Sequence, residues 1–474
     1  MKAPLVALIV TLSPIASVVA FAEGFLSSPQ DQYQQGIEYL DGKGVNADDA
    51  HAFELIKKAA DAGFAKAQAR VGILYANGSG TPKNEAGAVE YLQKSREQIQ
   101  KEATQGDPDA QTSLGYMYDH GMGMEKDLHG ALNWYAKAAN QGYPRGERSL
   151  GVCYFNSIGA EKNLTEAAKL FQKAADQGDA DAQSNLGLCY ASGLGVEKNL
   201  AEAARCYQKA ADQGDAVAQN LLGRCYYEGN GVEQNFAEAV KWYRKAIEQG
   251  NAWAQNNLAW CYETGGGVGQ NFVEAAKWYQ KAADQGNATA QVNLGYLYER
   301  GLGVKESLPE ALTLYHEAAD QGNATGLYDI GRCYELGTGL EQNFSEAVKW
   351  YEKATDQGYS DAQNNLGWSY EHGNGVVQNL AEAAKWYQKA ADQGNANAQI
   401  NLARCYYGGI GVEKNPAEAA KWHLKAAYQR HKEELRILVK SLVNYYHEGS
   451  DTPEDTAKAS SNSITVSPSP TATP

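Results

Sequence analysis

Residues 179–214, DADAQSNLGLCYASGLGVEKNLAEAARCYQKAADQG, hold two helical patterns joined by a glycine turn. In the first pattern, apolar side chains recur every four residues and share one side of a helix: Ala182, Leu186 and Tyr190. Gly193 and Gly195 favour a tight turn after it, because glycine tolerates positive φ. A second apolar pattern ends at Gly214, a typical helix-stop residue. We name the two predicted helices of this unit helix A and helix B.

The same unit recurs eleven times along the chain. The glycine slot of helix A, which alanine fills twice, marks each copy: Gly36, Gly72, Gly115, Gly151, Gly187, Gly223, Ala259, Gly295, Gly331, Gly367 and Ala403. Nine of the ten intervals are 36 residues, whereas Gly72 and Gly115 are 43 apart. Seven extra residues are about two helical turns, so we expect them to lengthen helix B of the second unit. The sequence thus predicts an all-α solenoid of eleven helix-turn-helix repeats over residues 23–430.

Helix B starts at a polar residue that is followed three residues later by glutamate: Asn163, Asn199, Asn235, Asn271, Ser307, Asn343, Asn379 and Asn415. This spacing predicts a capping box, in which the polar side chain accepts a backbone N–H and the glutamate reaches back to the cap. Four of the five Asn-x-Ser/Thr sequons coincide with predicted caps: Asn163, Asn287, Asn323 and Asn343. Capping explains those asparagines without a glycan. The glycine inside helix A suggests that another helix crosses closely there.

These residues resemble the Sel-one-like repeat family, a branch of the tetratricopeptide-like solenoids. The likeness is carried by Ala-x-x-x-Leu-Gly-x-x-Tyr-x-x-Gly-x-Gly-Val in helix A and its turn, and by Ala-x-x-Trp-Tyr-x-Lys-Ala-Ala-Asp-Gln-Gly in helix B. The resemblance implies a right-handed α/α superhelical solenoid with the A helices on its concave face. It also implies a non-enzymatic scaffold or adaptor for other proteins, and it leaves open a weak β-lactam-binding or hydrolysing activity.

The two ends of the chain differ from the repeats. Residues 1–22 carry a lysine, an apolar stretch and a small-residue site before Glu23, which predicts a cleaved signal peptide; the alternative is an uncleaved anchor. Residues 431–449 have leucines at helical spacing and predict a capping helix. The Ser/Thr/Pro-rich residues 450–474 predict a disordered tail. We expect an exported monomer without a membrane span after cleavage, periplasmic or secreted in a bacterium and in the endoplasmic reticulum or outside the cell in a eukaryote.

Several function classes find no support in the sequence. The 57 acidic residues outnumber the 42 basic residues and give a formal charge of −15, which argues against nucleic-acid binding. The eight histidines form no His-Glu-x-x-His pattern, and the paired glycines follow a helix, unlike those of a dinucleotide-binding loop. No serine nucleophile elbow occurs. We therefore predict no catalytic residue, no metal site and no cofactor.

Six of the seven cysteines share one slot, two residues after the helix-A glycine: Cys153, Cys189, Cys225, Cys261, Cys333 and Cys405. Neighbouring helices pack about 8–10 Å apart, whereas a disulfide needs Cα atoms within about 7 Å. Equivalent cysteines are therefore expected to fill the core as small hydrophobic residues. Cys206, in helix B, is the exception, because a bond to Cys189 or Cys225 stays open.

Two rows of helix-A residues are candidates for partner binding. The residue after the helix-A glycine faces away from the core side and belongs to the types enriched in binding hot spots: Arg224, Trp260, Tyr296, Arg332, Trp368 and Arg404. One turn earlier lies a row of amides suited to the backbone of an extended peptide: Asn185, Asn257, Asn293, Asn365 and Asn401. The alternative is that both rows pack against the next repeat. A recurring helix-B tryptophan next to core alanines is interpreted as packing: Trp134, Trp242, Trp278, Trp350, Trp386 and Trp422.

The two rows suggest two functions. The first is a scaffold that binds another protein or a peptide on its concave helix-A face. The second is a cell-envelope factor that binds polysaccharide or peptidoglycan, for which tryptophan and tyrosine rings would also serve as platforms. The sequence does not identify the partner.

Overall fold

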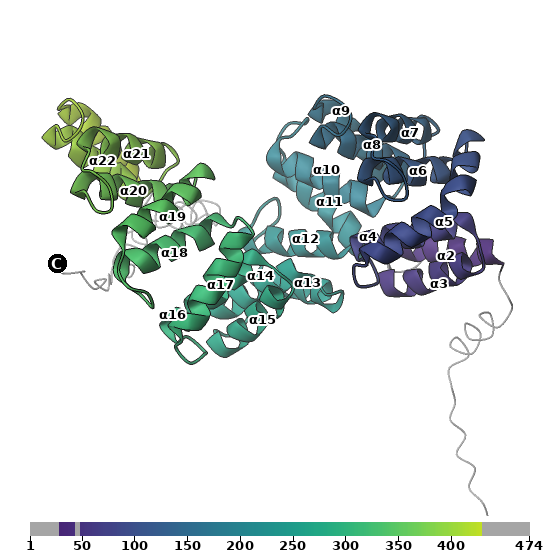
Figure 1. Ribbon diagram of the computed structural model, residues 1–474, viewed down its shortest axis with the longest axis horizontal. Coiled ribbons are helices and arrows are strands. Elements are labelled where there is room, and N and C mark those ends of the chain that lie inside the picture. The colour runs from purple at the N-terminus through teal and green to yellow at the C-terminus, as the bar shows by residue number, and fades with distance from the viewer. Residues whose placement is uncertain (1–27, 43–47, 429–474) are drawn as a thin grey trace, which may run out of the picture. The chain divides into compact units, whose positions relative to one another are not determined.

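The structure is a computed structural model that describes residues 28–42 and 48–428, where every regular element is a helix. Figure 1 shows A and B helices alternating along the chain. The A helices are α2 (Pro29–Asp41), α4 (Ala65–Asn77), α6 (Pro108–His120), α8 (Pro144–Asn156), α10 (Ala180–Ser192), α12 (Ala216–Glu228), α14 (Ala252–Thr264), α16 (Ala288–Arg300), α18 (Ala324–Leu336), α20 (Ser360–His372) and α22 (Ala396–Gly408). This arrangement confirms the predicted all-α fold of helix pairs.

The B helices follow their A helices after short glycine turns. They are α3 (Asp49–Asp61), α5 (Glu85–Thr104), α7 (Leu128–Asn140), α9 (Leu164–Asp176), α11 (Leu200–Asp212), α13 (Phe236–Glu248), α15 (Phe272–Asp284), α17 (Leu308–Asp320), α19 (Phe344–Asp356), α21 (Leu380–Asp392) and the helical residues 416–428. Helix α5 has 20 residues where the other complete B helices have 13, so the seven-residue insertion lengthens it as predicted. The predicted signal peptide, capping helix and tail lie outside the described residues.

The chain divides into two compact units, one ending at Lys305 and the other beginning at Glu306. Within each unit, a B helix packs against the A helix of its own repeat and the A helix of the next. Helix α11, for example, contacts α10 and α12, and helix α19 contacts α18 and α20. Packing between sequence neighbours alone is the rule in solenoids, whose stability adds up from repeat to repeat.

The helix-A glycine is covered by helix B of its own repeat, as the sequence suggested. In the repeat that begins α12, a methyl group on Gly223 would lie 2.6 Å from the ring of Tyr243 and 3.2 Å from the carbonyl oxygen of Ala239. Isoleucine, leucine or phenylalanine replaces the tyrosine in three of the first four repeats: Ile56, Leu92 and Phe171. The missing side chain thus lets helices A and B approach until an aromatic or aliphatic side chain covers the bare backbone.

The turn glycines have the backbone conformation that the sequence predicts. Gly193 ends α10 with φ of 70°, and Ser157, at the equivalent place, is the one non-glycine residue with positive φ in the described residues. The second turn glycine also touches the preceding repeat, since a methyl group on Gly195 would overlap the carbonyl group of Leu164 at the start of α9. The stop glycine Gly178 has positive φ but open space around it. Positive φ favours glycine at both positions, and the close contact with Leu164 is a second reason for glycine at Gly195.

The predicted capping boxes form only in half. Asn199 accepts the backbone N–H of Glu202 as predicted, but its own backbone N–H donates to the carbonyl of Tyr190 at 2.9 Å. Because that N–H already donates to Tyr190, it is not available to the side chain of Glu202, and the second bond of the capping box does not form. Glu202 instead pairs with Arg205, and Glu238 and Glu274 each pair with the lysine three residues on. Ser307 makes no side-chain capping bond, so the predicted cap is wrong there.

A buried glutamine that the sequence analysis did not single out links successive helices. Gln111 in α6 donates to the carbonyl of Ala103 in α5 at 3.1 Å and accepts from Gln141, after α7, at 2.8 Å. Gln219 makes the same two bonds, to Ala211 and Gln249, three repeats later. Each bridge satisfies a carbonyl near the end of a B helix, where intrahelical partners run out.

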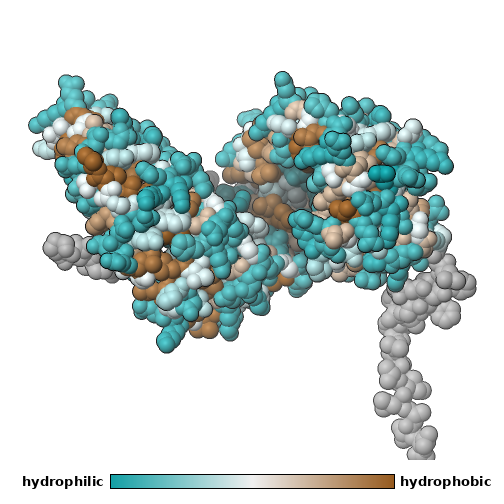
Figure 2. Space-filling model, viewed as in Figure 1, coloured by the Kyte–Doolittle hydropathy of each residue, from teal (hydrophilic) through white to brown (hydrophobic). Residues whose placement is uncertain are grey.

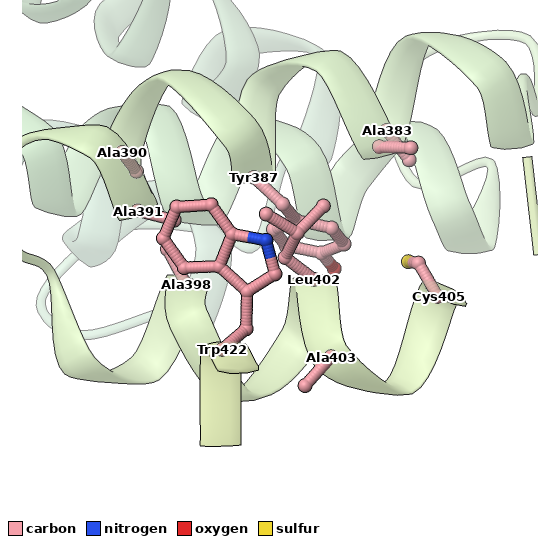
Figure 3. Packing of buried hydrophobic residues seen from close by; sticks show 10 residues of the cluster. Ala383, Tyr387, Ala390, Ala391, Ala398, Leu402, Ala403, Cys405 and Trp422 are labelled. Carbon is pink, nitrogen blue, oxygen red and sulfur yellow. The ribbon is translucent and has the colours of Figure 1, made fainter. Parts of the chain in front are cut away.

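The core contains a series of small clusters, each shared by two or three successive helices. Figure 3 shows the last of them, where Trp422 from residues 416–428 lies over the alanines of α21 and beside Leu402 of α22. A lysine one turn after the helix-B tryptophan covers the outer side of its ring, as Lys425 covers Trp422 at 3.7 Å. These contacts place the recurring tryptophan in packing, as interpreted from the sequence.

Candidate protein-binding surface

The A helices form the inner layer of each unit. Successive A helices touch directly, as α4 touches α6, α6 touches α8, and α20 touches α22. No comparable contact joins two B helices in the part of the chain that the structure describes. Because the more closely packed layer of a curved array is the inner one, the A helices provide the concave side.

The row after the helix-A glycine is exposed in the first unit. Trp260 retains 44% of its accessible surface and Tyr296 retains 41%, while Arg224 is exposed. In the second unit, Arg332 and Trp368 are half-buried, and Arg404 forms an ion pair with Glu371 at 2.6 Å. The first unit therefore presents the more accessible part of the predicted row.

The row of amides is half-buried and bonds mainly between repeats. Asn257 donates to Asn220 at 2.8 Å and Asn293 donates to Asn256 at 3.1 Å, in each case across to the preceding repeat. Asn401 donates to Asn364 in the same way, and Asn365 donates to the hydroxyl of Tyr351 in helix B of the preceding repeat. These amide N–H groups are thus engaged in holding A helices together. Asn185 differs, because it lies on the wall of a cavity.

Two further apolar residues on the inner layer were missed by the sequence analysis. Trp253 retains 56% of its accessible surface and lies seven residues before Trp260 in α14. Seven residues are two helical turns, so the two indoles share one face of the helix. Val217 fills the slot of Trp253 in the preceding repeat and is also exposed. A search for bulky residues two turns apart would have found the pair.

Figure 2 shows that hydrophilic residues cover most of the visible surface, with hydrophobic patches scattered among them. Single exposed apolar residues are common on proteins. Trp253 and Trp260 differ from such single residues because two large rings share one helix face. They also differ from the helix-B tryptophans, whose rings are covered by lysines. Large apolar rings on a concave, polar-rimmed surface are typical of protein-binding sites.

A cavity of about 1220 Å³ opens in the first unit, lined by residues from the end of α2 to the end of α13, most of them in A helices. Figure 1 shows that the path of α2–α12 curves back toward its start. Asp41 at the end of α2 forms an ion pair with Arg145 of α8 at 2.5 Å. Gly42 lies against the backbone carbonyl of Gln213, so that a side chain at Gly42 would not fit. The first repeat thus contacts the fourth and fifth repeats across the cavity.

One buried carboxylate ties the first four repeats together. Asp109 in α6 accepts from Arg70 at 3.0 Å, from Tyr143 at 3.1 Å and from the hydroxyl of Tyr33. Burial alone would raise the pKa of Asp109, but the guanidinium groups of Arg70 and Arg145 hold that pKa below its usual range. Each partner comes from a different repeat, so this cluster fixes the curvature of the N-terminal array.

The cysteines are buried and free, in agreement with the slot argument. Burial raises the pKa of Cys153 to about 12 and that of Cys189 to about 11. Cys206 is also unbonded and buried. Thiols of this kind are poor nucleophiles and poor metal ligands near neutral pH.

The described residues hold neither a metal-binding cluster nor a membrane-spanning helix. No group of three or more histidine, cysteine, aspartate or glutamate side chains within residues 28–42 and 48–428 is arranged to hold a metal ion. Over the same residues, no helix is both long and apolar enough to cross a membrane.

The fold and the repeat define a helical-repeat solenoid protein, and comparison with known proteins identifies its family. The Sel1 repeat matches eleven successive stretches: residues 29–64, 65–98, 108–143, 144–179, 180–215, 216–251, 254–287, 288–323, 324–359, 360–395 and 396–431. The chain belongs to the Sel1 repeat family. Proteins of this family are generally protein-interaction scaffolds, and their fold is typically non-enzymatic.

Solved structures with this fold resemble the chain along much of its length. A protective antigen present in uropathogenic Escherichia coli strains, which displays an SLR fold, is 31% identical, with 98% of this chain and 100% of that one covered and a TM-score of 0.50. A Sel1 repeat protein from Oxalobacter formigenes is 36% identical, with 52% of this chain and 96% of that one covered and a TM-score of 0.45. No curated protein matches the chain.

Proposed function

We propose that this protein is an exported scaffold that binds another protein on the concave helix-A face. The observation that carries the proposal is the exposed pair Trp253 and Trp260 on the inner layer of the first unit. Tyr296, one repeat further, retains a similar exposed fraction and is flanked by Arg300 at 5.6 Å from its ring. Aromatic rings held rigidly on helices bind partners at low entropic cost.

The remaining residues of the predicted row have a smaller part in the proposal. Arg224 fills the slot of Trp260 in the preceding repeat and is exposed, 3.9 Å from the carboxylate of Glu228. In the second unit, Arg332, Trp368 and Arg404 would form a separate contact. Partial burial limits Arg332 and Trp368, and the ion pair with Glu371 limits the exposed Arg404. The amides Asn257, Asn293, Asn365 and Asn401 would offer a partner their oxygen atoms more readily than their N–H groups.

The test is truncation of the tryptophan pair. A partner is first identified by cross-linking in the native compartment and mass spectrometry, and then titrated as a purified protein. Changing Trp253 and Trp260 to alanine should weaken binding by about thirtyfold or more, the effect of losing ~2 kcal/mol at a hot spot. The matched control is Trp278→Ala, since Trp278 packs beside the core of α13 and α14. That control should lower the melting temperature and keep the partner's affinity; the reverse pattern would refute the proposal.

Binding of cell-envelope polysaccharide or peptidoglycan is the second candidate. Trp253 and Trp260 favour it as well, since two indoles on one helix face suit stacking against sugar rings. Purified peptidoglycan sacculi distinguish the two functions. If sacculi retain the wild type and release the Trp253/Trp260 double variant, the polysaccharide function replaces the protein scaffold.

Export rests on the sequence of residues 1–22. The apolar stretch and the small residues before Glu23 have the form of a signal peptide, and the host decides between periplasm, secretion and the endoplasmic reticulum. Amino-terminal sequencing of the native protein should begin at Glu23. A chain that retains Met1 would show that export by cleavage does not occur.

A further inference from the structure

The B helix of the last repeat, residues 416–428, exposes a face that α21 buries one repeat earlier. In α21 this face belongs to the cluster shared with α22, where Ala384, Tyr387 and Ala391 are at most 2% exposed. The residues in the same three slots of the last repeat are exposed: Ala420, His423 and Ala427. No A helix follows residues 416–428 within the described part of the chain, so this end of the array lacks the layer that covers the earlier B helices.

Two neighbouring slots on the outside of the same helix are apolar instead of polar. In four earlier B helices a glutamine in the first slot donates to an aspartate one turn later: Gln172 to Asp176, Gln208 to Asp212, Gln280 to Asp284 and Gln388 to Asp392. The last repeat has Leu424 and Tyr428 there, which are 73% and 59% exposed. Adjacent apolar side chains in slots that are elsewhere polar indicate that another segment covers them.

A buried glutamine beneath this face has an unbonded oxygen. Gln399 of α22 is 2% exposed and donates to the carbonyl of Ala391, but its Oε1 accepts no hydrogen bond from the described residues. In earlier repeats the equivalent oxygen accepts from a glutamine 30 residues further along the chain: Gln111 from Gln141, Gln219 from Gln249, Gln255 from Gln285 and Gln363 from Gln393. The same spacing leads from Gln399 to Gln429, the first residue after those described.

We propose that residues 429–449 pack on the exposed face of residues 416–428. Gln429 donates to Oε1 of Gln399, and this bond fixes where the segment starts. The contact gives the capping helix predicted from the sequence a defined surface. Because the segment is joined directly to Tyr428, its packing costs less entropy than the binding of a separate molecule. Its leucines recur at helical spacing and match the apolar face: Leu435, Leu438 and Leu442.

The inference assigns the end face to this chain itself and not to a second copy. A second copy would also cover apolar side chains such as Leu424 and Tyr428. Only the segment that follows residue 428 brings a glutamine to Gln399 at the spacing that the earlier repeats use. The inference is independent of the proposed scaffold surface, since the tryptophan pair belongs to the other unit.

Hydrogen exchange with mass spectrometry on the full chain tests this packing. Amides of residues 432–449 should be protected at least about tenfold relative to an unstructured peptide. Ala427→Glu puts a carboxylate into the contact and should reduce that protection at least about tenfold, because burying an unpaired charge is costly. The matched control is Ala417→Glu in the same helix, since the equivalent Ala381 is exposed even though α22 follows it. The control should change the protection by less than about twofold.

A second variant tests the bond separately and alters no described residue. Gln429→Glu keeps the shape of the side chain but has no N–H to donate to Gln399. Protection of residues 432–449 should fall about two- to tenfold, the effect of losing one neutral hydrogen bond. Exchange in α20 and α21 is the folding control for every variant and should stay at the wild-type level.

Four results would overturn the inference. Residues 432–449 could exchange without protection, or Ala427→Glu and Ala417→Glu could reduce their protection equally. Unchanged protection in Gln429→Glu would refute the bond to Gln399. Protection that falls when the protein is diluted would show that a second copy covers the face. If Ala427→Glu fails to fold, Gln429→Glu and the dilution series decide the matter.

Discussion

Asp109→Asn tests whether one carboxylate holds the N-terminal repeats together. The substitution keeps the shape of the side chain and removes the charge that faces Arg70, whose side chain is 10% exposed beside a 13% exposed Asp109. Breaking one partner of a buried ion pair costs about 3–5 kcal/mol, because the other charge stays buried. We expect about 3 kcal/mol here, at the low end, since the asparagine keeps one oxygen that accepts from the hydroxyl of either Tyr33 or Tyr143, which bond different oxygens of Asp109.

Hydrogen exchange with mass spectrometry measures the effect repeat by repeat. Protection should fall in α2–α9 and stay unchanged from α14 onward, because solenoid repeats depend on their neighbours. The paired variant Asp109→Leu with Arg70→Met should be closer to the wild type than Asp109→Asn alone. A loss below about 0.5 kcal/mol, or a loss spread evenly over both units, would refute the reasoning.

The same cluster predicts how protection depends on pH. The pKa of Asp109 is lower in the folded protein than in the unfolded chain, where an aspartate titrates near about 3.9. Its contribution to stability is therefore complete above that value and is lost as the pH falls through the lower folded pKa. Protection of α2–α9 in the wild type should decline in that acid range, and the Asp109→Asn variant should lack this part of the decline.

Two further predictions concern the turns and the thiols. Gly195→Ala should destabilise the protein by about 1–3 kcal/mol more than Gly178→Ala in urea unfolding, because only the first substitution also overlaps the carbonyl group of Leu164; equal losses would show that positive φ alone matters. Thiol titration without reductant should find seven thiols per chain in denaturant and slow reaction in the native protein. Five thiols in denaturant would indicate a disulfide that involves Cys206.

The repeat, its helix pair and its turns were predictable because each depends on residues close in sequence. Gly193 and Ser157 have positive φ in the same slot, and the insertion after Gly72 lengthens α5 without interrupting the array. The capping box was only half predictable. Asn199 caps as its sequence suggests, but the competing bond from its N–H to Tyr190 depends on how helix A returns beside the turn. No local pattern contains that geometry.

The candidate site was harder to predict than the fold. Sequence periodicity identified the outward slot of Trp260 and Tyr296, yet it did not show that Asn257 bonds to Asn220 in the repeat before it. The cavity was beyond local reasoning, since it depends on Asp41 meeting Arg145 after the array has curved through three repeats. Curvature accumulates from small rotations at every interface, and a single repeat does not determine it.

The regular interfaces of the middle repeats bear on how such a gene changes length. The repeats that begin α10, α12 and α14 have the same turn contact and the same buried glutamine slot: Gln183, Gln219 and Gln255. Unequal recombination that adds or deletes one of these repeats would create few interfaces that the protein does not already contain. The first four repeats differ, because removing any one of them deletes either Asp109 or a side chain that bonds to it. Natural variation in copy number is therefore expected after the fourth repeat and should be rare before it.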